Sequence, residues 1–284
     1  MALNNRPTDP APPRNPTMKT LRLVVVLAVP LLCACAGLPE SQTKPVNARQ
    51  LEFVAHRRAG PVVVFENGLG ARMEWWGKVL PEIAGKASYF SYNRPGYGRS
   101  APADTPRDGA QVVQELRAAL LSEGMPPPYV LVGHSLGGLY MQLFARQHPQ
   151  EVAALILVDS THPKQLEGVG AMENQSLWVR GLVGALVTGT AKEELDLLAQ
   201  TGEQVLSLPT LLDKPVFVLS ASEPMKETSE LARFANEKRA DIARMYPGSK
   251  QVWVESGHAI PLEKPEAVVS AIRAALALAQ ASKQ

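Results

Sequence analysis

Residues 129–138 read YVLVGHSLGG, a stretch that changes character at its midpoint. The apolar residues 129–132 predict a short buried strand, and the helical apolar pattern that resumes after Ser135 ends at Pro149. A serine on a sharp strand-to-helix turn has a strained backbone, so the residues two positions away must be very small. Gly133 and Gly137 meet that requirement. The stretch therefore predicts that Ser135 lies exposed at the carboxyl end of a buried strand, as a candidate nucleophile.

The rest of the chain alternates short apolar runs with helical patterns from about residue 40 onward. Such alternation is typical of an α/β fold, in which a mostly parallel, doubly wound sheet is covered by helices on both faces. The predicted strands are residues 62–65, 87–92, 129–132, 152–158, 216–219 and 251–254.

The alternation lapses between about residues 160 and 209, where the pattern is helical and no strand is indicated. An insertion of about 50 residues without a strand is too small for an independent domain. We expect a small helical lid over the carboxyl edge of the sheet, within one domain that spans residues 37–284.

Residues 1–36 are expected to lie outside that domain. Residues 1–17 are rich in Pro and Asn and predict disorder, whereas residues 18–22 are basic and precede an apolar run of about 14 residues. That order is typical of a signal peptide, since the run is short for a membrane span. Cleavage after Ala36 and lipidation of Cys35 both fit the sequence. We expect export to a bacterial periplasm or a lipid-anchored place in the envelope, with secretion as an alternative.

Composition excludes several classes of function. Lys and Arg number 29 against 27 Asp and Glu, and a net charge of +2 gives no reason to expect a nucleic-acid partner. Both cysteines, Cys33 and Cys35, fall in the N-terminal segment, so the domain has no thiol nucleophile and no disulfide. The five histidines show no metal-binding spacing, and no Walker-type phosphate loop is present. We expect neither a metal nor a cofactor.

Two backbone amides are candidates for stabilising an oxyanion. Leu136 follows the serine at a helix N-terminus, where its N–H faces the reacting group. Residues 66–70 (ENGLG) follow the predicted strand at 62–65, and their glycines let the backbone approach a ligand closely. The Leu69 N–H is therefore the second candidate.

The best candidate for a general base is His258, in the loop Glu255-Ser256-Gly257-His258 after the last predicted strand. A parallel sheet brings that strand end to the same edge as Ser135. His134 is the alternative base, although we expect its side chain to point away from the serine.

Four motifs in this order resemble the α/β-hydrolase superfamily: NGLG after a strand, YNRPGYGRS (92–100), GHSLGG (133–138) and SGHAIPLEKPE (256–266). They are most similar to its esterase, lipase-like and cofactor-free haloperoxidase-like branch. The resemblance covers about residues 50–280 and implies the α/β-hydrolase fold. A serine at position 135 argues against the branches with an aspartate nucleophile, the dehalogenases and epoxide hydrolases. The resemblance also implies that Arg94, Tyr97 and Arg99 shape a glycine-rich loop and form surface ion pairs.

The acidic partner of the histidine is ambiguous. Relatives often carry an aspartate in the loop after the strand at 216–219, but this sequence has Ser222 and Glu223 there. Asp159, at the end of the strand at 152–158, is the alternative used in some relatives. Either carboxylate would serve if it reached His258. We favour Asp159 over Glu223, with Glu227 third.

These residues predict a serine hydrolase that cleaves a small or medium hydrophobic carboxylic ester through an acyl-enzyme. The alternatives are carbon–carbon bond hydrolysis or perhydrolysis on the same residues. A non-catalytic envelope binding protein is a further alternative, since the usual acidic residue is missing. The sequence does not indicate an oligomeric state.

Overall fold

The structure is a computed structural model, and it describes residues 38–210 and 213–281. The predicted disorder, signal peptide and lipidation of Cys35 concern residues outside these ranges. Within the described ranges no helix is both long and apolar enough to span a bilayer.

One eight-stranded sheet organises the chain, in the spatial order β1-β2-β4-β3-β5-β6-β7-β8. The first two strands are antiparallel to their neighbours, and β4, β3, β5, β6, β7 and β8 are parallel. The sheet thus confirms the predicted mostly parallel, doubly wound architecture. The strands are β1 (Gln42–Val46), β2 (Arg49–His56), β3 (Val62–Glu66), β4 (Ser88–Tyr92), β5 (Tyr129–His134), β6 (Val152–Val158), β7 (Val216–Ala221) and β8 (Lys250–Val254).

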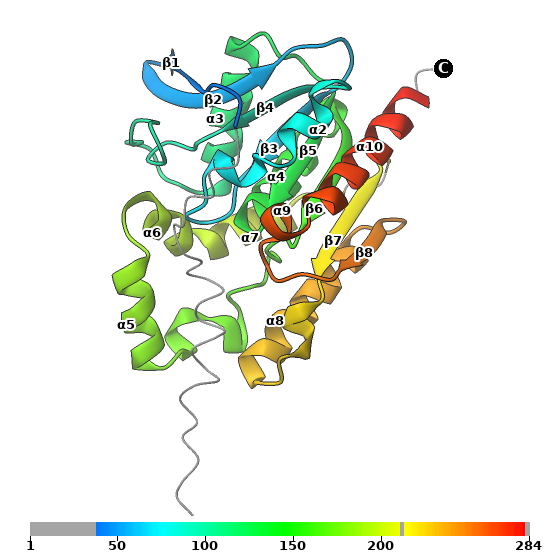
Figure 1. The fold of residues 1–284 in the computed structure, drawn as a ribbon. Coiled ribbons are helices and arrows are strands. Elements are labelled where there is room, and N and C mark those ends of the chain that lie inside the picture. Colours follow the sequence, from blue (N-terminus) through cyan, green and yellow to red (C-terminus); the bar gives the residue numbers. More distant parts are fainter. Residues whose placement is uncertain (1–37, 211–212, 282–284) are drawn as a thin grey trace, which may run out of the picture.

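Helices cover both faces of the sheet (Figure 1). The larger are α3 (Gly109–Ser122), α4 (Leu136–Gln147), α5 (Leu177–Leu186), α6 (Gly189–Asp196), α7 (Leu198–Leu206), α8 (Glu230–Asp241) and α10 (Pro265–Ala281). The short ones are α2 (Leu80–Ala84), α9 (Ile260–Glu263) and the 3-10 turns η1 (Met73–Trp76), η2 (Pro149–Glu151), η3 (Gly168–Gly170), η4 (Met172–Asn174), η5 (Glu223–Lys226) and η6 (Ile242–Met245).

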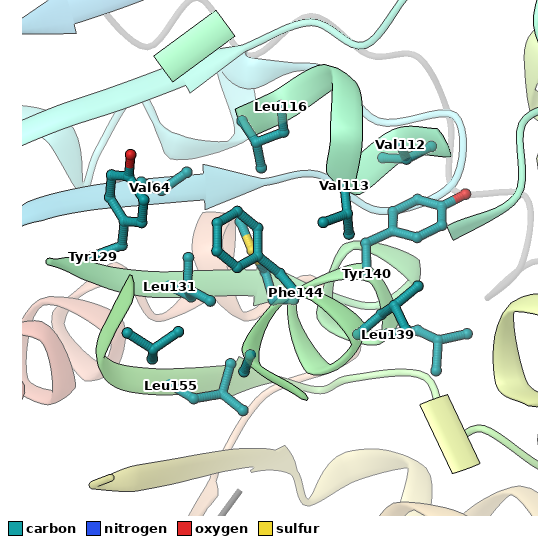
Figure 2. Packing of buried hydrophobic residues seen from close by; sticks show 14 of the residues in the cluster. Val64, Val112, Val113, Leu116, Tyr129, Leu131, Leu139, Tyr140, Phe144 and Leu155 are labelled. Atoms are coloured by element: carbon teal, nitrogen blue, oxygen red, sulfur yellow. The ribbon is translucent and has the colours of Figure 1, made fainter. Parts of the chain in front are cut away.

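Alternate residues of each central strand enter two separate apolar cores, because successive side chains point to opposite faces. In β3, Val64 packs with α3 and α4, whereas Val63 and Phe65 pack with α2 and α10. Figure 2 shows the first of these cores, where Phe144 of α4 lies beside Leu131 of β5. Since both faces are covered, these strands appear in the sequence as continuous apolar runs.

The strand register brings three loops to one edge of the sheet. His134 pairs with Val158, so β5 and β6 end at the same level, and Val158 pairs with Leu219, close to the end of β7 at Ala221. The chain leaves these strands into the segments that start with Ser135, Asp159 and Ser222.

In the described part of the segment between β6 and β7, the chain forms helices and no strand. The parts of this segment pack differently. Helix α7 contributes Leu198 and Val205 to the main core, whereas α5 packs through a small cluster of Val179, Val183 and its C-cap residue Val187. In Figure 1, α5 and α6 lie beyond the carboxyl end of the sheet. The outer face of α5 leaves Leu177 and Trp178 exposed.

Candidate active site

Ser135 occupies the turn between β5 and α4 in a strained backbone conformation. Its φ of 53° and ψ of −122° lie where residues with a Cβ are rarely found. A Cβ on Gly133 would lie 2.4 Å from the carbonyl oxygen of Gly137, and one on Gly137 would lie 2.4 Å from that of Glu66. The predicted need for small residues on both sides of the serine therefore holds: the turn is too tight for anything larger.

His258 lies within hydrogen-bond distance of the serine. The distance from His258 Nε2 to Ser135 Oγ is 2.9 Å, and that from His258 Nδ1 to Asp159 Oδ2 is 2.6 Å. Because a carboxylate only accepts, Nδ1 carries the proton and Nε2 accepts from the serine hydroxyl. The structure thus joins three residues from the ends of β5, β6 and the loop after β8 in one line of hydrogen bonds.

Asp159 is held on both of its oxygens. Oδ1 accepts from the Ala221 amide at 3.0 Å and from Arg239 Nε at 2.8 Å, while Oδ2 accepts from His258. Burial by itself raises the pKa of this carboxyl, but the Arg239 cation and the bond from His258 outweigh it and hold the pKa well below its usual range. Asp159 is therefore ionised wherever the protein is folded near neutral pH.

Glu223 does not approach the histidine. Its carboxylate pairs with Lys226 at 2.7 Å on the protein surface, within the 3-10 turn that follows β7. The structure brings Asp159 to His258 and leaves Glu223 in solvent, and it gives no bond between Glu227 and the histidine.

The two predicted oxyanion donors flank the serine. Leu136 is the first residue of α4, so its N–H is one of the helix's unpaired amides. The loop that carries Leu69 passes against Ser135, since a Cβ on Gly68 would lie 3.2 Å from the Ser135 Cβ. Within the described residues, neither amide has a protein acceptor.

His134 has a role that the sequence did not suggest. Its ring lies 4.8 Å from that of His258 and 5.0 Å from that of Trp75, and its Nε2–H donates to the His258 carbonyl at 2.9 Å. Among the described residues His134 gives the serine hydroxyl no hydrogen bond, and its ring instead bonds the backbone carbonyl of His258. Burial lowers its pKa to about 3, so His134 is neutral.

Arg94 corrects another expectation, because its side chain is 1% exposed and forms no surface pair. It lies between the carboxylates of Glu66 and Glu194, and the latter comes from α6. Arg99 does form the expected pair near the surface, with Glu52. The contacts of Glu194 and Arg239 could not be predicted from the sequence, because each residue is one of several charged residues on a polar helix.

No group of three or more His, Cys, Asp or Glu side chains within residues 38–210 and 213–281 is arranged to hold a metal ion. The groups that the structure brings together at this edge of the sheet are the serine hydroxyl, the imidazole, the carboxylate and the two amides.

Comparison with known proteins gives one family and several partial relatives. A family model described as alpha/beta hydrolase fold matches residues 61–256. The chain is 32% identical over 106 residues to the uncharacterized protein YqjL of Bacillus subtilis, covering 37% of this chain and 42% of that one. It is 32% identical over 156 residues to a pimeloyl-[acyl-carrier protein] methyl ester esterase of Chromobacterium violaceum, covering 55% and 56%. The chain thus spans about half the length of these relatives.

Among solved structures, a putative epoxide hydrolase from Pseudomonas aeruginosa is similar with a TM-score of 0.61 and 15% identity. The match covers 86% of this chain and 97% of that one. At this identity the likeness concerns the fold alone.

Proposed function

The chain belongs to the alpha/beta hydrolase fold family, and from this premise we propose that it is a serine hydrolase acting on a small or medium hydrophobic carboxylic ester. The observation that carries the proposal is the line of hydrogen bonds from Ser135 through His258 to Asp159. The same line of hydrogen bonds supports an enzyme over a non-catalytic binding protein, the alternative suggested by the missing carboxylate after β7.

In the proposed reaction, Ser135 Oγ attacks the ester carbonyl carbon while His258 Nε2 takes the hydroxyl proton. Asp159 keeps Nδ1 protonated and stabilises the imidazolium that forms. The tetrahedral intermediate collapses when its carbon–oxygen bond to the alcohol breaks, and His258 returns the proton to the departing oxygen. A water molecule then attacks the acyl-enzyme by the same route, releasing the carboxylic acid and restoring Ser135.

The carbonyl oxygen becomes negatively charged in both tetrahedral intermediates. The N–H groups of Leu69 and Leu136 are proposed to hold it, because both flank Ser135 and neither has another acceptor among the described residues. Leu136 has the further advantage of its place at the N-terminus of α4.

Support for an apolar ester comes from what surrounds the loop. Leu69 packs against the cluster of Val179, Val183 and Val187 at α5 and its C-cap, so the proposed lid presents apolar side chains beside the proposed oxyanion amide. A partial relative is named as a methyl ester esterase. Hydrolysis rates across a series of esters of increasing acyl length should peak at short or medium chains. A preference for charged or very bulky acyl groups would contradict the substrate class.

The reaction class is tested by labelling the purified protein with a fluorophosphonate, which reacts with activated serines. The wild-type protein should be labelled, and Ser135→Ala should not. If a correctly folded wild-type protein takes up no label and hydrolyses no ester, the serine hydrolase proposal is wrong.

We also propose that the protein is exported and anchored through lipidated Cys35, on the basis of the apolar run that precedes this residue. Membrane fractions of a bacterial host should then contain the wild-type protein, and Cys35→Ser should move it to the soluble fraction. Equal distribution of both proteins would contradict the anchor.

A further inference from the structure

We propose that Arg94 and Glu194 are a positioning pair that fixes the Leu69 amide for oxyanion binding, so that the inserted helix α6 is part of the catalytic scaffold. The inference rests on the proposed serine hydrolase function. It assigns a role to the buried charge cluster that the reaction steps above do not use.

The first step of the argument is the geometry of one peptide unit. The carbonyl of Gly68 and the N–H of Leu69 belong to the same planar peptide group and point in opposite directions. Arg94 Nη2 donates to the Gly68 carbonyl at 2.9 Å. This bond fixes the orientation of the peptide and turns the Leu69 N–H away from the guanidinium.

The peptide groups on either side of this unit are held by the same cluster. Arg94 Nη1 donates to the Asn67 carbonyl at 2.6 Å, and the Gly70 N–H donates to Tyr97 Oη at 3.3 Å. The loop glycines would otherwise allow each peptide to rotate freely. With the neighbouring groups occupied, the Leu69 amide is left as the donor that has no acceptor among the described residues.

Glu194 in turn fixes the guanidinium. Its Oε1 accepts from Arg94 Nε at 2.7 Å, and its Oε2 accepts from Nη2 at 2.9 Å and from the Tyr97 hydroxyl at 2.8 Å. A two-point arginine–carboxylate pair sets the plane of the guanidinium as well as its position. Glu194 therefore determines where Nη2, and with it the Gly68 carbonyl, is held.

The pair is buried in a way that keeps both charges. Arg94 and Glu194 are each 1% exposed, and Glu66 neutralises the far side of the guanidinium at 2.7 Å. Burial by itself lowers the pKa of Arg94, but the two carboxylates outweigh it and raise the pKa well above its usual value. Because a buried ion pair contributes little net stability, its value here is the geometry it imposes.

A second contact, between Gly96 and Thr190, docks α6 beside the Arg94–Glu194 pair. A Cβ on Gly96 would lie 1.9 Å from the Thr190 hydroxyl, so the start of α6 rests directly on the loop that carries Arg94. Leu69 itself packs against the valines of α5. The insertion thus acts on the loop at residues 66–70 in two ways. Glu194 of α6 binds Arg94, which holds the Gly68 carbonyl, and the valine cluster at α5 packs against Leu69.

The test compares Glu194→Gln with Asp196→Asn on the same helix. Glutamine keeps the shape of the buried side chain and one acceptor but loses the two-point charge, whereas Asp196 forms an exposed pair with Lys192. For each variant we would measure kcat and KM on an ester, per active site titrated with fluorophosphonate. We would also measure affinity for a trifluoromethyl ketone, whose adduct with a serine carries an oxyanion.

Glu194→Gln should lower kcat by roughly 10- to 100-fold with KM within about threefold, since removing an oxyanion donor outright costs about 100- to 1,000-fold. Affinity for the ketone should fall by the same factor as kcat. Asp196→Asn should match wild type in both. If Glu194→Gln does not fold, Tyr97→Phe, which deletes only the hydroxyl bound by Gly70 and Glu194, should change kcat and ketone affinity in the same direction by a smaller factor.

A lowered melting temperature with unchanged kcat and ketone affinity would overturn the inference, because it would leave the pair a structural role only. That result is distinct from a failure of the proposed function, in which wild type itself takes up no fluorophosphonate and hydrolyses no ester.

Discussion

Arg239 donates through Nε to Oδ1 of Asp159 at 2.8 Å, on the oxygen that His258 leaves free. The Asp159 carboxylate thus binds both the Arg239 guanidinium, which comes from α8, and the His258 imidazole. Part of the negative charge of Asp159 is compensated by Arg239, and less of it remains to stabilise the protonated histidine.

Replacing Arg239 with methionine should move the acidic limb of the kcat/KM profile to higher pH by roughly half to one unit. Without the guanidinium, the carboxylate favours the imidazolium more strongly, so the base stays protonated, and inactive, to a higher pH. Asp159 does not itself titrate on this limb because its pKa lies well below the usual range. His134, whose ring lies beside that of His258, does not titrate on this limb either, because its pKa is about 3. Arg244→Met, at an exposed pair with Asp241, is the control and should leave the limb in place.

Asp159→Asn should lower kcat by about 1,000- to 10,000-fold, whereas Glu223→Gln should change it by less than about threefold. The neutral amide of Asn cannot stabilise the imidazolium as the carboxylate does. Asn suits the backbone because position 159 has a φ of 38°, a region that Asn and Asp tolerate. Steady-state kinetics of the two purified variants decide between the carboxylates. A larger loss in the Glu223 variant would transfer the acidic role to the loop after β7.

His134→Phe should lower kcat by roughly 10- to 100-fold, and His134→Gln should retain most of it. Phenylalanine keeps a ring beside Trp75 but has no donor for the His258 carbonyl, whereas glutamine offers an N–H at a similar reach. The measurement is kcat at the plateau of the pH profile, corrected for active sites by titration. Equal activity of the two variants would show that the bond does not position the base.

Gly133→Ala should destabilise the fold by about 1–3 kcal/mol or prevent folding, because the added methyl group would meet backbone atoms of α4 at 2.4 to 2.7 Å. Gly181→Ala on α5 is the matched control, since a Cβ there meets nothing within 4 Å. Alanine favours a helix interior over glycine, so the control should be neutral or more stable by up to about 1 kcal/mol. Urea unfolding of both variants checks the contrast, and an unperturbed Gly133→Ala protein would contradict the strained turn.

The strand pattern could be predicted for the buried part of the sheet and for the edge strand β8, but not for the hairpin of β1 and β2 at the other edge. Strands β3 to β7 are covered on both faces and show as apolar runs in the sequence. The edge strand β1 reads QTKPV with four exposed residues, and β2 joins it through a turn at Asn47 and Ala48, both with positive φ. No apolar run marked this hairpin, because an edge strand has little to bury.

The position of the candidate nucleophile could be predicted from the sequence, because the constraint on Ser135 is local: a strained turn that excludes side chains at Gly133 and Gly137. The sequence also placed His258 at the right edge, because parallel strands all end on one side.

Which side chains meet at that edge depends on the tertiary structure. Asp159 reaches His258, and Glu194 reaches Arg94 from 100 positions away in the chain. Those contacts depend on which strand ends are adjacent and where α6 and α8 dock. Packing of the whole domain sets both, whereas chain spacing between charged residues does not.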